Sequence, residues 1–124
     1  MCVSQYVEVR FQVVGFHSWP DAPKELLFLR NVHRHTFHFR VRASVKHTDR
    51  AIEFTVMKRY LYEVIISHFG PNCAADFGSK SCEMLAQWLH DNAKEYTDEI
   101  VEIGVSEDGE FEGILQWHQT VRPG

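Results

Sequence analysis

The sequence contains little cysteine and no long apolar run, and both features narrow the class of protein. Its three cysteines, Cys2, Cys73 and Cys82, are odd in number and widely separated, unlike a disulfide framework or a paired-cysteine zinc site. No stretch approaches the roughly 18 apolar residues of a membrane span, and the amino end lacks the regions of a signal peptide. We therefore expect a cytoplasmic protein with no membrane partner, in which histidine supplies most ligands of any bound metal.

Positive charge is also scarce. Thirteen lysines and arginines stand against 17 acidic residues, giving a net charge of -4. Proteins that bind nucleic acid need clustered cations to neutralise phosphates, so nucleic acid is not an expected partner. The 124 residues fit one compact domain, since domains cluster around roughly 100 to 150 residues. We predict a single domain over residues 1–124.

Apolar residues alternate with polar ones in two early segments. The alternation covers residues 6–14 and again residues 33–45, and a period of two is that of a strand with one buried face. Between them, residues 15–25 contain glycine and prolines and are predicted to form a loop. The two strands are expected to pair as a long antiparallel ribbon.

The second half of the sequence predicts two helices followed by a hairpin. Apolar residues recur at spacings of three and four over residues 54–68, as in an amphipathic helix, and Ser81 is suited to cap a second helix. Alternation returns over residues 101–105, and the turn sequence Asp108–Gly109 precedes a last strand over residues 111–117. The predicted fold class is therefore α+β, with the order ββααββ.

Two histidines stand at adjacent same-side positions of the second strand. His33 and His35 are separated by one residue on an extended segment, so both imidazoles project from one face, about 6.5 to 7 Å apart at their Cα atoms. A catalytic zinc ion needs three protein ligands and one open position. His17, at the exit of the first strand, is a candidate for the third ligand. The alternative is that the pair consists of two surface histidines.

Two further residues are candidates for chemistry. His68 lies in the last turn of the first helix, where it is either a structural residue or a general acid or base, because its pKa lies close to neutral. Glu107 has the same parity as Val101, Ile103 and Val105, so all four side chains should face inward; otherwise Glu107 is a solvated turn residue. The remaining histidines are interpreted as surface residues: His38, His47, His90 and His118.

Five segments carry a resemblance to a known family. They are F-Q-V-V-G-F-H ending at His17, H-R-H-T-F-H-F-R-V from His33, A-I-E-F-T-V-M-K from Ala51, S-C-E-M-L-A-Q-W-L from Ser81, and V-S-E ending at Glu107. In order and spacing they resemble the 6-pyruvoyltetrahydropterin synthase and 6-carboxytetrahydropterin synthase family, whose second branch belongs to queuosine biosynthesis. The resemblance spans nearly the whole chain.

The resemblance implies a tunnelling fold, in which ββααββ subunits with an antiparallel sheet and two helices on one face assemble as homo-oligomers, often trimers or hexamers. It implies Zn²⁺ on His17, His33 and His35, a pterin ring received by Glu107, and proton transfer by His68. The expected activity is that of a carbon–oxygen lyase acting on dihydroneopterin triphosphate or a related pterin.

Two positions depart from the family pattern. Leu29 stands where the queuosine-pathway branch has a catalytic cysteine, and Ser67 stands where the family has an aspartate before the helix-terminal histidine. Four residues remain open as substitutes for the missing proton carrier: Glu25, Cys73, Asp76 and Cys82. The predicted function is therefore a zinc-dependent lyase, and the alternatives are a non-catalytic pterin- or purine-binding module and a structural metal-binding subunit.

Overall fold

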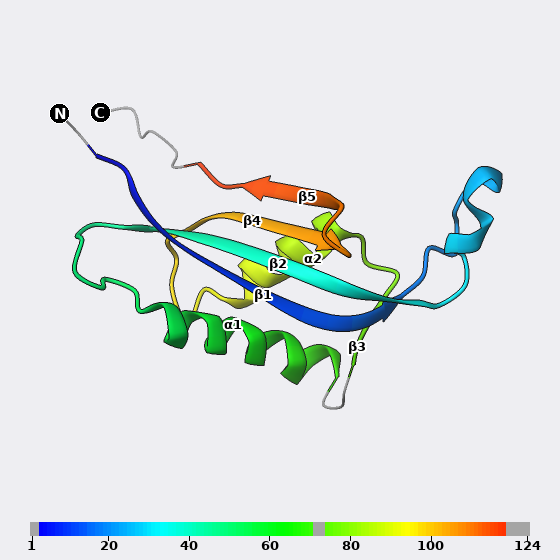
Figure 1. The fold of residues 1–124 in the computed structure, drawn as a ribbon, viewed down its shortest axis with the longest axis horizontal. Helices are drawn as coiled ribbons and strands as arrows, with labels where there is room; N and C mark the ends of the chain where they lie inside the picture. The colour runs from blue at the N-terminus through cyan, green and yellow to red at the C-terminus, as the bar shows by residue number, and fades with distance from the viewer. Residues whose placement is uncertain (1–2, 71–73, 119–124) are drawn as a thin grey trace.

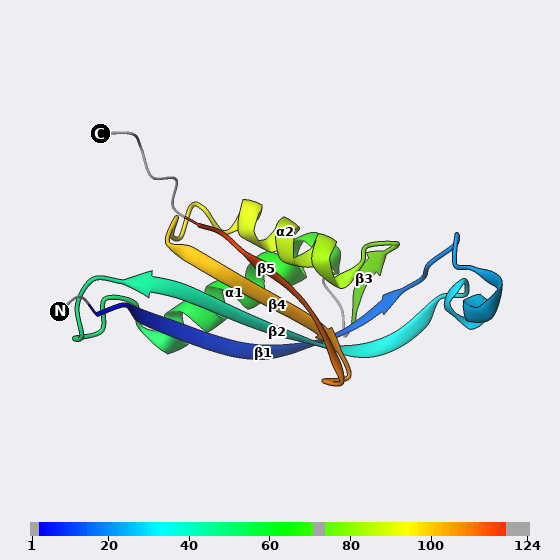
Figure 2. The same cartoon turned by 90° about the horizontal axis from the view of Figure 1, so that it is seen from above.

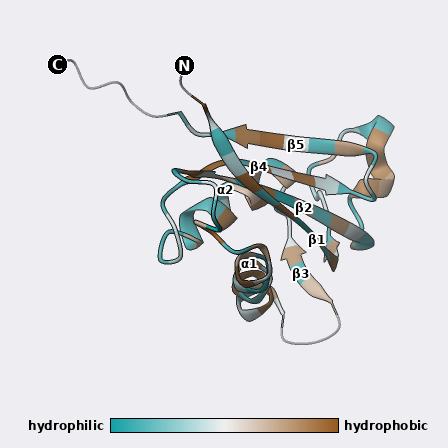
Figure 3. Ribbon diagram, turned by 60° about the vertical axis from the view of Figure 1, so that its left-hand side comes forward, coloured by the Kyte–Doolittle hydropathy of each residue, from teal (hydrophilic) through white to brown (hydrophobic). Residues whose placement is uncertain are grey.

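A five-stranded sheet carries two helices on one of its faces (Figure 1). The structure is a computed structural model that describes residues 3–70 and 74–118. Its elements are β1 (Gln5–His17), the 3-10 helix η1 (Lys24–Leu29), β2 (His33–Val45), α1 (Phe54–Phe69), β3 (Ala75–Gly78), α2 (Cys82–Asn92), β4 (Ile100–Glu107) and β5 (Phe111–Gln116). The strand order is β3-β1-β2-β4-β5. The predicted α+β class and the placement of both helices are confirmed (Figure 3).

The β1–β2 ribbon forms the long axis of the sheet. The two strands pair antiparallel without a register shift, from Gln5 opposite Val45 to His17 opposite His33. The inner side of the sheet and three buried residues of each helix form one core, in which α1 packs against β1 and α2 against β4 and β5, and each large apolar side chain buried in this way contributes about 1.5 to 3 kcal/mol. The side chains of this core with the least exposure include Phe37, Phe39, Val41, Met57, Leu61, Ile65, Leu85 and Leu89.

The structure departs from the sequence prediction next to β1. This strand runs to His17 and does not end at Val14, because its last residues pair with β2 on one side and with β3 on the other. Gly15, predicted to belong to a loop, lies within this pairing, and a Cβ there would lie 2.4 Å from Phe77 Cε2. β3 was not predicted, because four residues are too few to show a period. The predicted loop also continues into η1, which projects beyond the end of the sheet (Figure 2).

A bulge in β4 changes which of its residues face the core. Arg42 lies opposite Glu102 and Ala43 opposite Ile100, so one residue of β4 is extra at this point. Ile100 and Ile103 are buried, whereas Val101 is partly exposed. Beyond the bulge the alternation is regular, and Glu107 shares the face of Ile103 and Val105. The inward direction predicted for Glu107 therefore holds.

An ion-pair network covers the other face of the sheet. The Arg40 guanidinium donates to Glu102 and, at 2.9 Å, to Glu112, and it also lies 3.4 Å from Glu8. Gly104 leaves the space that the Glu112 carboxylate occupies, since a Cβ there would overlap Glu112 Oε1. Four strands are joined by this one arginine. Among the described residues, neither helix is long and apolar enough to cross a membrane.

The network gives folding a pH dependence. Hydrogen bonds from Gln116 and Arg40 lower the pKa of Glu102 below its ordinary value of 4.5. The stability that this group contributes is therefore present above its unfolded pKa and is lost as the pH falls through its folded pKa. We expect Glu102→Gln to lower the free energy of unfolding by about 1 to 3 kcal/mol at pH 7. Between pH 5 and pH 3 the free energy of unfolding should then decrease less in the variant than in the wild type. Urea titration at each pH measures both quantities.

The control is Glu110→Gln, which removes an exposed carboxylate from a turn. It should change neither quantity by more than about 0.5 kcal/mol. Equal stability loss in the two variants would contradict a special role for Glu102.

Candidate metal centre

The inner rows of β1 and β2 change from apolar residues to histidines at one end of the sheet. Val13, Gly15 and His17 follow one another on the inner side of β1, and His33 and His35 continue the row of Phe37 on β2. Residues of one parity lie on one face of a strand. The register that places His17 opposite His33 therefore gathers all three imidazoles beyond the core.

The three imidazoles face one another closely. One nitrogen from each of His17, His33 and His35 lies within 4.8 Å of the other two. In each ring the Nε2 atom is buried and has no hydrogen-bond partner. Buried polar atoms without partners are costly, and a zinc ion at about 2.0 to 2.1 Å from each nitrogen satisfies all three. The donor set thus fits a zinc ion.

The opposite nitrogens of two of these rings are anchored. His33 Nδ1 donates to the backbone carbonyl of Asn31 at 2.8 Å, and His35 Nδ1 lies 2.5 Å from Asp108 Oδ2. Because a carbonyl or a carboxylate oxygen only accepts, each histidine carries a proton on Nδ1, which leaves Nε2 as the nitrogen that can bind a metal ion. Carboxylates and carbonyls behind metal-bound histidines hold them in this way.

His17 is held in the neutral form that metal binding requires. Burial is the largest influence and lowers its pKa, and the rings of His33 and His35 act in the same direction. The carboxylate of Glu107 and a hydrogen bond to the backbone of Lys80 oppose this shift without reversing it. A neutral imidazole offers a lone pair at neutral pH.

Asp108 is a site residue that the sequence analysis did not single out. It occupies the β4–β5 turn with φ 54°, followed by Gly109 with φ 78°, and these two left-handed residues lie in the three-residue connection between the paired residues Glu107 and Phe111. Its Oδ1 also accepts from the backbone of Thr36 at 3.1 Å. The bond from His35 is the main reason that the pKa of Asp108 is lowered. The turn was predicted from the sequence. The contact of Asp108 with His35 was not, because it depends on the register in which β2 pairs with β4.

Glu107 lies against the histidines. Its Oε1 is 3.1 Å from His17 Nε2 and its Oε2 is 3.5 Å from His35 Nε2, and its side chain is 28% exposed. It is therefore an inward-facing carboxylate next to the candidate metal centre, and not a solvated turn residue.

A cavity of about 580 Å³ opens beside this cluster. His17, His33 and Glu107 line one part of it. The other residues that line it are Ser18, Trp19, Leu29, Ser79, Lys80, Ser81, Cys82, Glu83, Met84, Phe111, Glu112 and Gly113. A concave site with apolar walls and few convergent polar groups is the usual form of a small-molecule site.

Only one of the four candidate proton carriers reaches this cavity within the described residues. Cys82, at the first turn of α2, lines it, whereas Glu25 and Asp76 are exposed elsewhere, and Cys73 lies outside the described residues. Burial, followed by the negative charges of Glu107 and Glu83, raises the pKa of the Cys82 thiol to about 12. The thiol is therefore protonated at neutral pH.

The structure does not bring His68 to the metal centre of its own chain. Its side chain is exposed at the end of α1, where the ring lies 4.7 Å from that of Phe69 and 4.8 Å from that of Trp88. His90, interpreted from sequence as a surface residue, is instead partly buried and stacks on Trp117 with ring centroids 3.8 Å apart.

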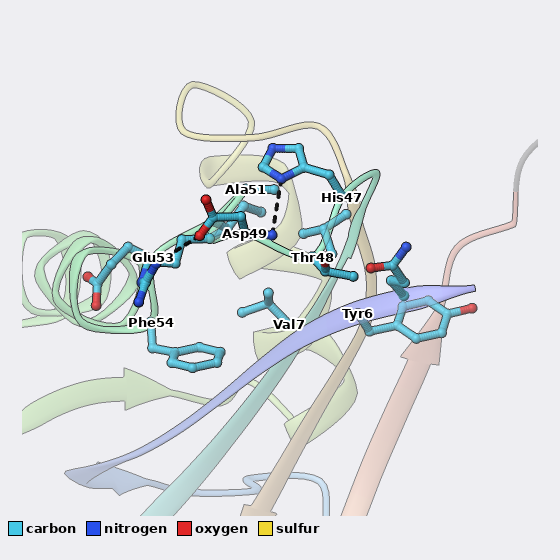
Figure 4. A pocket seen from close by; sticks show the side chains of 12 residues that line it. Tyr6, Val7, His47, Thr48, Asp49, Ala51, Glu53 and Phe54 are labelled. Atoms are coloured by element: carbon cyan, nitrogen blue, oxygen red, sulfur yellow. Dashed lines mark hydrogen bonds and ion pairs between the residues drawn. The ribbon is translucent and has the colours of Figure 1, made fainter. Parts of the chain in front are cut away.

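A second cavity, of about 680 Å³, lies at the other end of the ribbon (Figure 4). Its polar side chains have local partners. His47 Nδ1 accepts from the backbone of Asp49, Arg50 pairs with Asp49 at 2.8 Å, and Glu53 caps α1 by accepting from Val56. Among the described residues that line this cavity, no buried polar atom lacks a partner, so the histidine cavity is the stronger candidate site.

No protein-family model matches the sequence, and no curated protein matches it either. Solved structures do match the fold. The 6-pyruvoyl tetrahydropterin synthase of Caenorhabditis elegans is 9% identical with a TM-score of 0.68, covering 94% of this chain and 97% of that one. The enzyme of the same name from Plasmodium falciparum is 17% identical with a TM-score of 0.62, covering 94% and 99%. An uncharacterised protein of Wolinella succinogenes is 10% identical with a TM-score of 0.70, covering 93% and 99%.

These similarities define the fold of the chain. It has the fold of the 6-pyruvoyl tetrahydropterin synthases over nearly its whole length, as the sequence resemblance implied.

The contact between Asp108 and His35 can be tested by metal affinity. Asp108→Asn removes the charge that holds the His35 proton on Nδ1, and such changes behind a metal ligand typically weaken binding by about 10- to 100-fold. We expect that loss for zinc, measured by competition with a chromophoric chelator. Glu110→Gln, in the same turn but exposed, should bind zinc like the wild type. Unchanged affinity in Asp108→Asn would show that this contact has no role in metal binding.

Proposed function

We propose that the chain is the subunit of a zinc-dependent lyase that acts on a pterin. The observation that carries the proposal is the convergence of three buried, unpartnered Nε2 atoms at the edge of a cavity containing the Glu107 carboxylate. The fold shared with 6-pyruvoyl tetrahydropterin synthases supports the same conclusion. His17, His33 and His35 would hold the ion, which as a Lewis acid polarises oxygen atoms of a bound substrate.

The chain's own side chains bind and orient the substrate. The Glu107 carboxylate can accept two N–H groups from the planar edge of a pterin, a bidentate arrangement that carboxylates favour. Trp19 and Phe111 offer aromatic faces in the same cavity. The Cys82 thiol lines the same cavity, but its raised pKa makes it a poor proton carrier at neutral pH, so we do not assign it the role of the cysteine that Leu29 replaces.

We also propose that the subunits form a homo-oligomer. β3 pairs only with the last three residues of β1, so the outer edge of the rest of β1 and the outer edge of β5 have no neighbouring strand among the described residues. Such edges attract further strands, and pairing β5 of one copy with β1 of the next would cover both. In that assembly His68 could act only in a neighbouring copy's cavity. Sedimentation equilibrium showing only monomers would exclude this assembly.

A second candidate function is a metal-bearing module without lyase activity. Leu29 lines the cavity and cannot transfer a proton. In addition, the distances of 3.1 and 3.5 Å from Glu107 to two ligand nitrogens are close to the roughly 3.4 Å that separates ligands of tetrahedral zinc. Glu107 could therefore complete a closed, structural site.

The assignment of the metal ligands can be tested with His33→Ala. The purified wild type should contain one zinc per chain by elemental analysis and convert dihydroneopterin triphosphate or a related pterin. His33→Ala leaves two ligands, too few for a stable site, and should lose zinc and turnover together. His47→Ala, at an exposed turn, is the control. Full zinc content in His33→Ala would contradict the ligand assignment.

Glu107→Gln separates the two candidate functions. If Glu107 receives the pterin, the variant keeps its zinc and binds the pterin about 30-fold more weakly, because losing a charge-assisted hydrogen bond costs about 2 kcal/mol. If Glu107 is instead a fourth ligand, zinc affinity falls in the absence of any pterin. Parallel titrations with zinc and with a pterin decide between these outcomes.

A further inference from the structure

The outer edges of β1 and β5 are complementary in direction. β1 pairs antiparallel with β2, β2 with β4 and β4 with β5, so β1 and β5 run in opposite directions. Cyclic assemblies are built by rotations, and a rotation about an axis parallel to the strands preserves the direction of each strand. In a ring of copies, β5 of one copy therefore lies antiparallel to β1 of the next.

The free hydrogen-bonding groups of both edges belong to residues of one face of the sheet. Ser18 N donates to Gly78 O on the side of β3, which is also the free side of β1, and Trp117 N donates to Val101 O, away from the free side of β5. Since successive N–H groups of a strand point to opposite sides, the even-numbered residues of both strands direct theirs to the free edges. The side chains of these residues lie on the face of the ion-pair network. An antiparallel pair of the two edges therefore matches hydrogen bonds and faces at once.

On that face the two edges carry opposite charges. The side chain of Arg10, on β1, is 75% exposed and contacts Glu8 at 2.6 Å. Glu8 also accepts from Arg42 at 2.9 Å, which directs its carboxylate towards β2 and leaves Arg10 as the cation at the free edge. On β5, the side chain of Glu112 is 35% exposed, and Arg40 is its one ion-pair partner among the described residues. The edge of β1 thus offers a cation and the edge of β5 a carboxylate.

Two registers match both faces and keep all six residues of β5 on the free part of β1, residues 5–14. In the first, Phe111–Gln116 lies opposite Phe11–Tyr6 of the next copy, and in the second it lies opposite Val13–Glu8. Glu112 is therefore opposite Arg10 or opposite Gln12. Directly opposed aromatic residues and directly opposed opposite charges both stabilise an antiparallel pair. The first register provides both kinds of contact, and the second provides neither.

We infer that Arg10 pairs with Glu112 of the neighbouring copy and sets the register in which β5 and β1 join. This inference rests on the homo-oligomer proposed above and names the contact that aligns its subunits. Glu112 stays bonded to Arg40 of its own chain at 2.9 Å, so the ion pairs of this face continue from one copy into the next. The network that joins four strands within the chain then also joins the copies.

Disulfide cross-linking of the full chain tests this register directly. Within one chain, β2 and β4 separate β1 from β5, a distance of about 14 Å at about 4.8 Å per step. A disulfide needs Cα atoms within about 7 Å of each other, so a bond between positions 10 and 112 forms only between copies. Directly opposite residues lie about 5.5 Å apart. We expect mild oxidation of Arg10→Cys/Glu112→Cys to give covalent oligomers whose peptide maps contain the 10–112 disulfide.

Three controls separate the outcomes. Gln12→Cys/Glu112→Cys reports the second register, each single cysteine variant reports pairing of like edges, and the oxidised wild type reports bonds of the native cysteines. An oligomer that cross-links through 12–112, through like edges or not at all would overturn the inference and leave the proposed assembly standing. A protein that is monomeric by sedimentation would overturn both. Zinc content and pterin turnover, measured on the wild type, report on the lyase independently of these results.

A charge reversal provides a second readout that needs no engineered cysteine. Arg10→Glu places two carboxylates opposite each other, and we expect it to weaken assembly about tenfold or more in sedimentation equilibrium. Adding Glu112→Gln to Arg10→Glu removes the repulsion and should recover about threefold or more of that loss, the non-additivity expected of residues in contact. Lys24→Glu makes the same charge change in η1, beyond the end of the sheet (Figure 2), and should leave assembly unchanged. Equal effects of Arg10→Glu and Lys24→Glu, or no recovery in the double variant, would overturn the pairing.

Discussion

The candidate site depends on the register in which β1 pairs with β2. This register places His17 directly opposite His33. His35 lies two residues further along β2, on the same face of that strand. A slip of one residue would turn every side chain of one strand to the other face, which would separate the imidazoles and expose the core row at the same time. The apolar residues that specify the core therefore also specify the candidate metal centre.

The β4–β5 hairpin completes this arrangement from the other side of β2. Phe37 lies opposite Glu107, so the end of β4 brings one carboxylate to the open face of the histidines, and the turn that follows brings Asp108 behind His35. The two acids have different tasks for a simple geometric reason. Glu107 faces the Nε2 side, where we propose that an ion or substrate binds, and Asp108 faces the Nδ1 side of His35, where it accepts the ring proton.

Alternation in the sequence predicted the strands, the inward face of His33 and His35, and the parity of Glu107, because these follow from local period alone. The short strand β3, the close packing of Phe77 on Gly15 and the contact between Asp108 and His35 were not predictable in this way, since each joins segments far apart in the chain. The inclusion of Cys82 in the cavity and the separation of His68 from it also depend on how α1 and α2 pack. The sequence resemblance supplied the fold, and the structural similarities confirm it.

The most direct test of the account is X-ray absorption spectroscopy at the zinc edge on the zinc-loaded protein. The account predicts a first shell of three imidazole nitrogens at about 2.0 to 2.1 Å together with one oxygen ligand. A sulfur neighbour at about 2.3 Å, fewer than three imidazoles in the shell, or failure of the protein to retain zinc would contradict it.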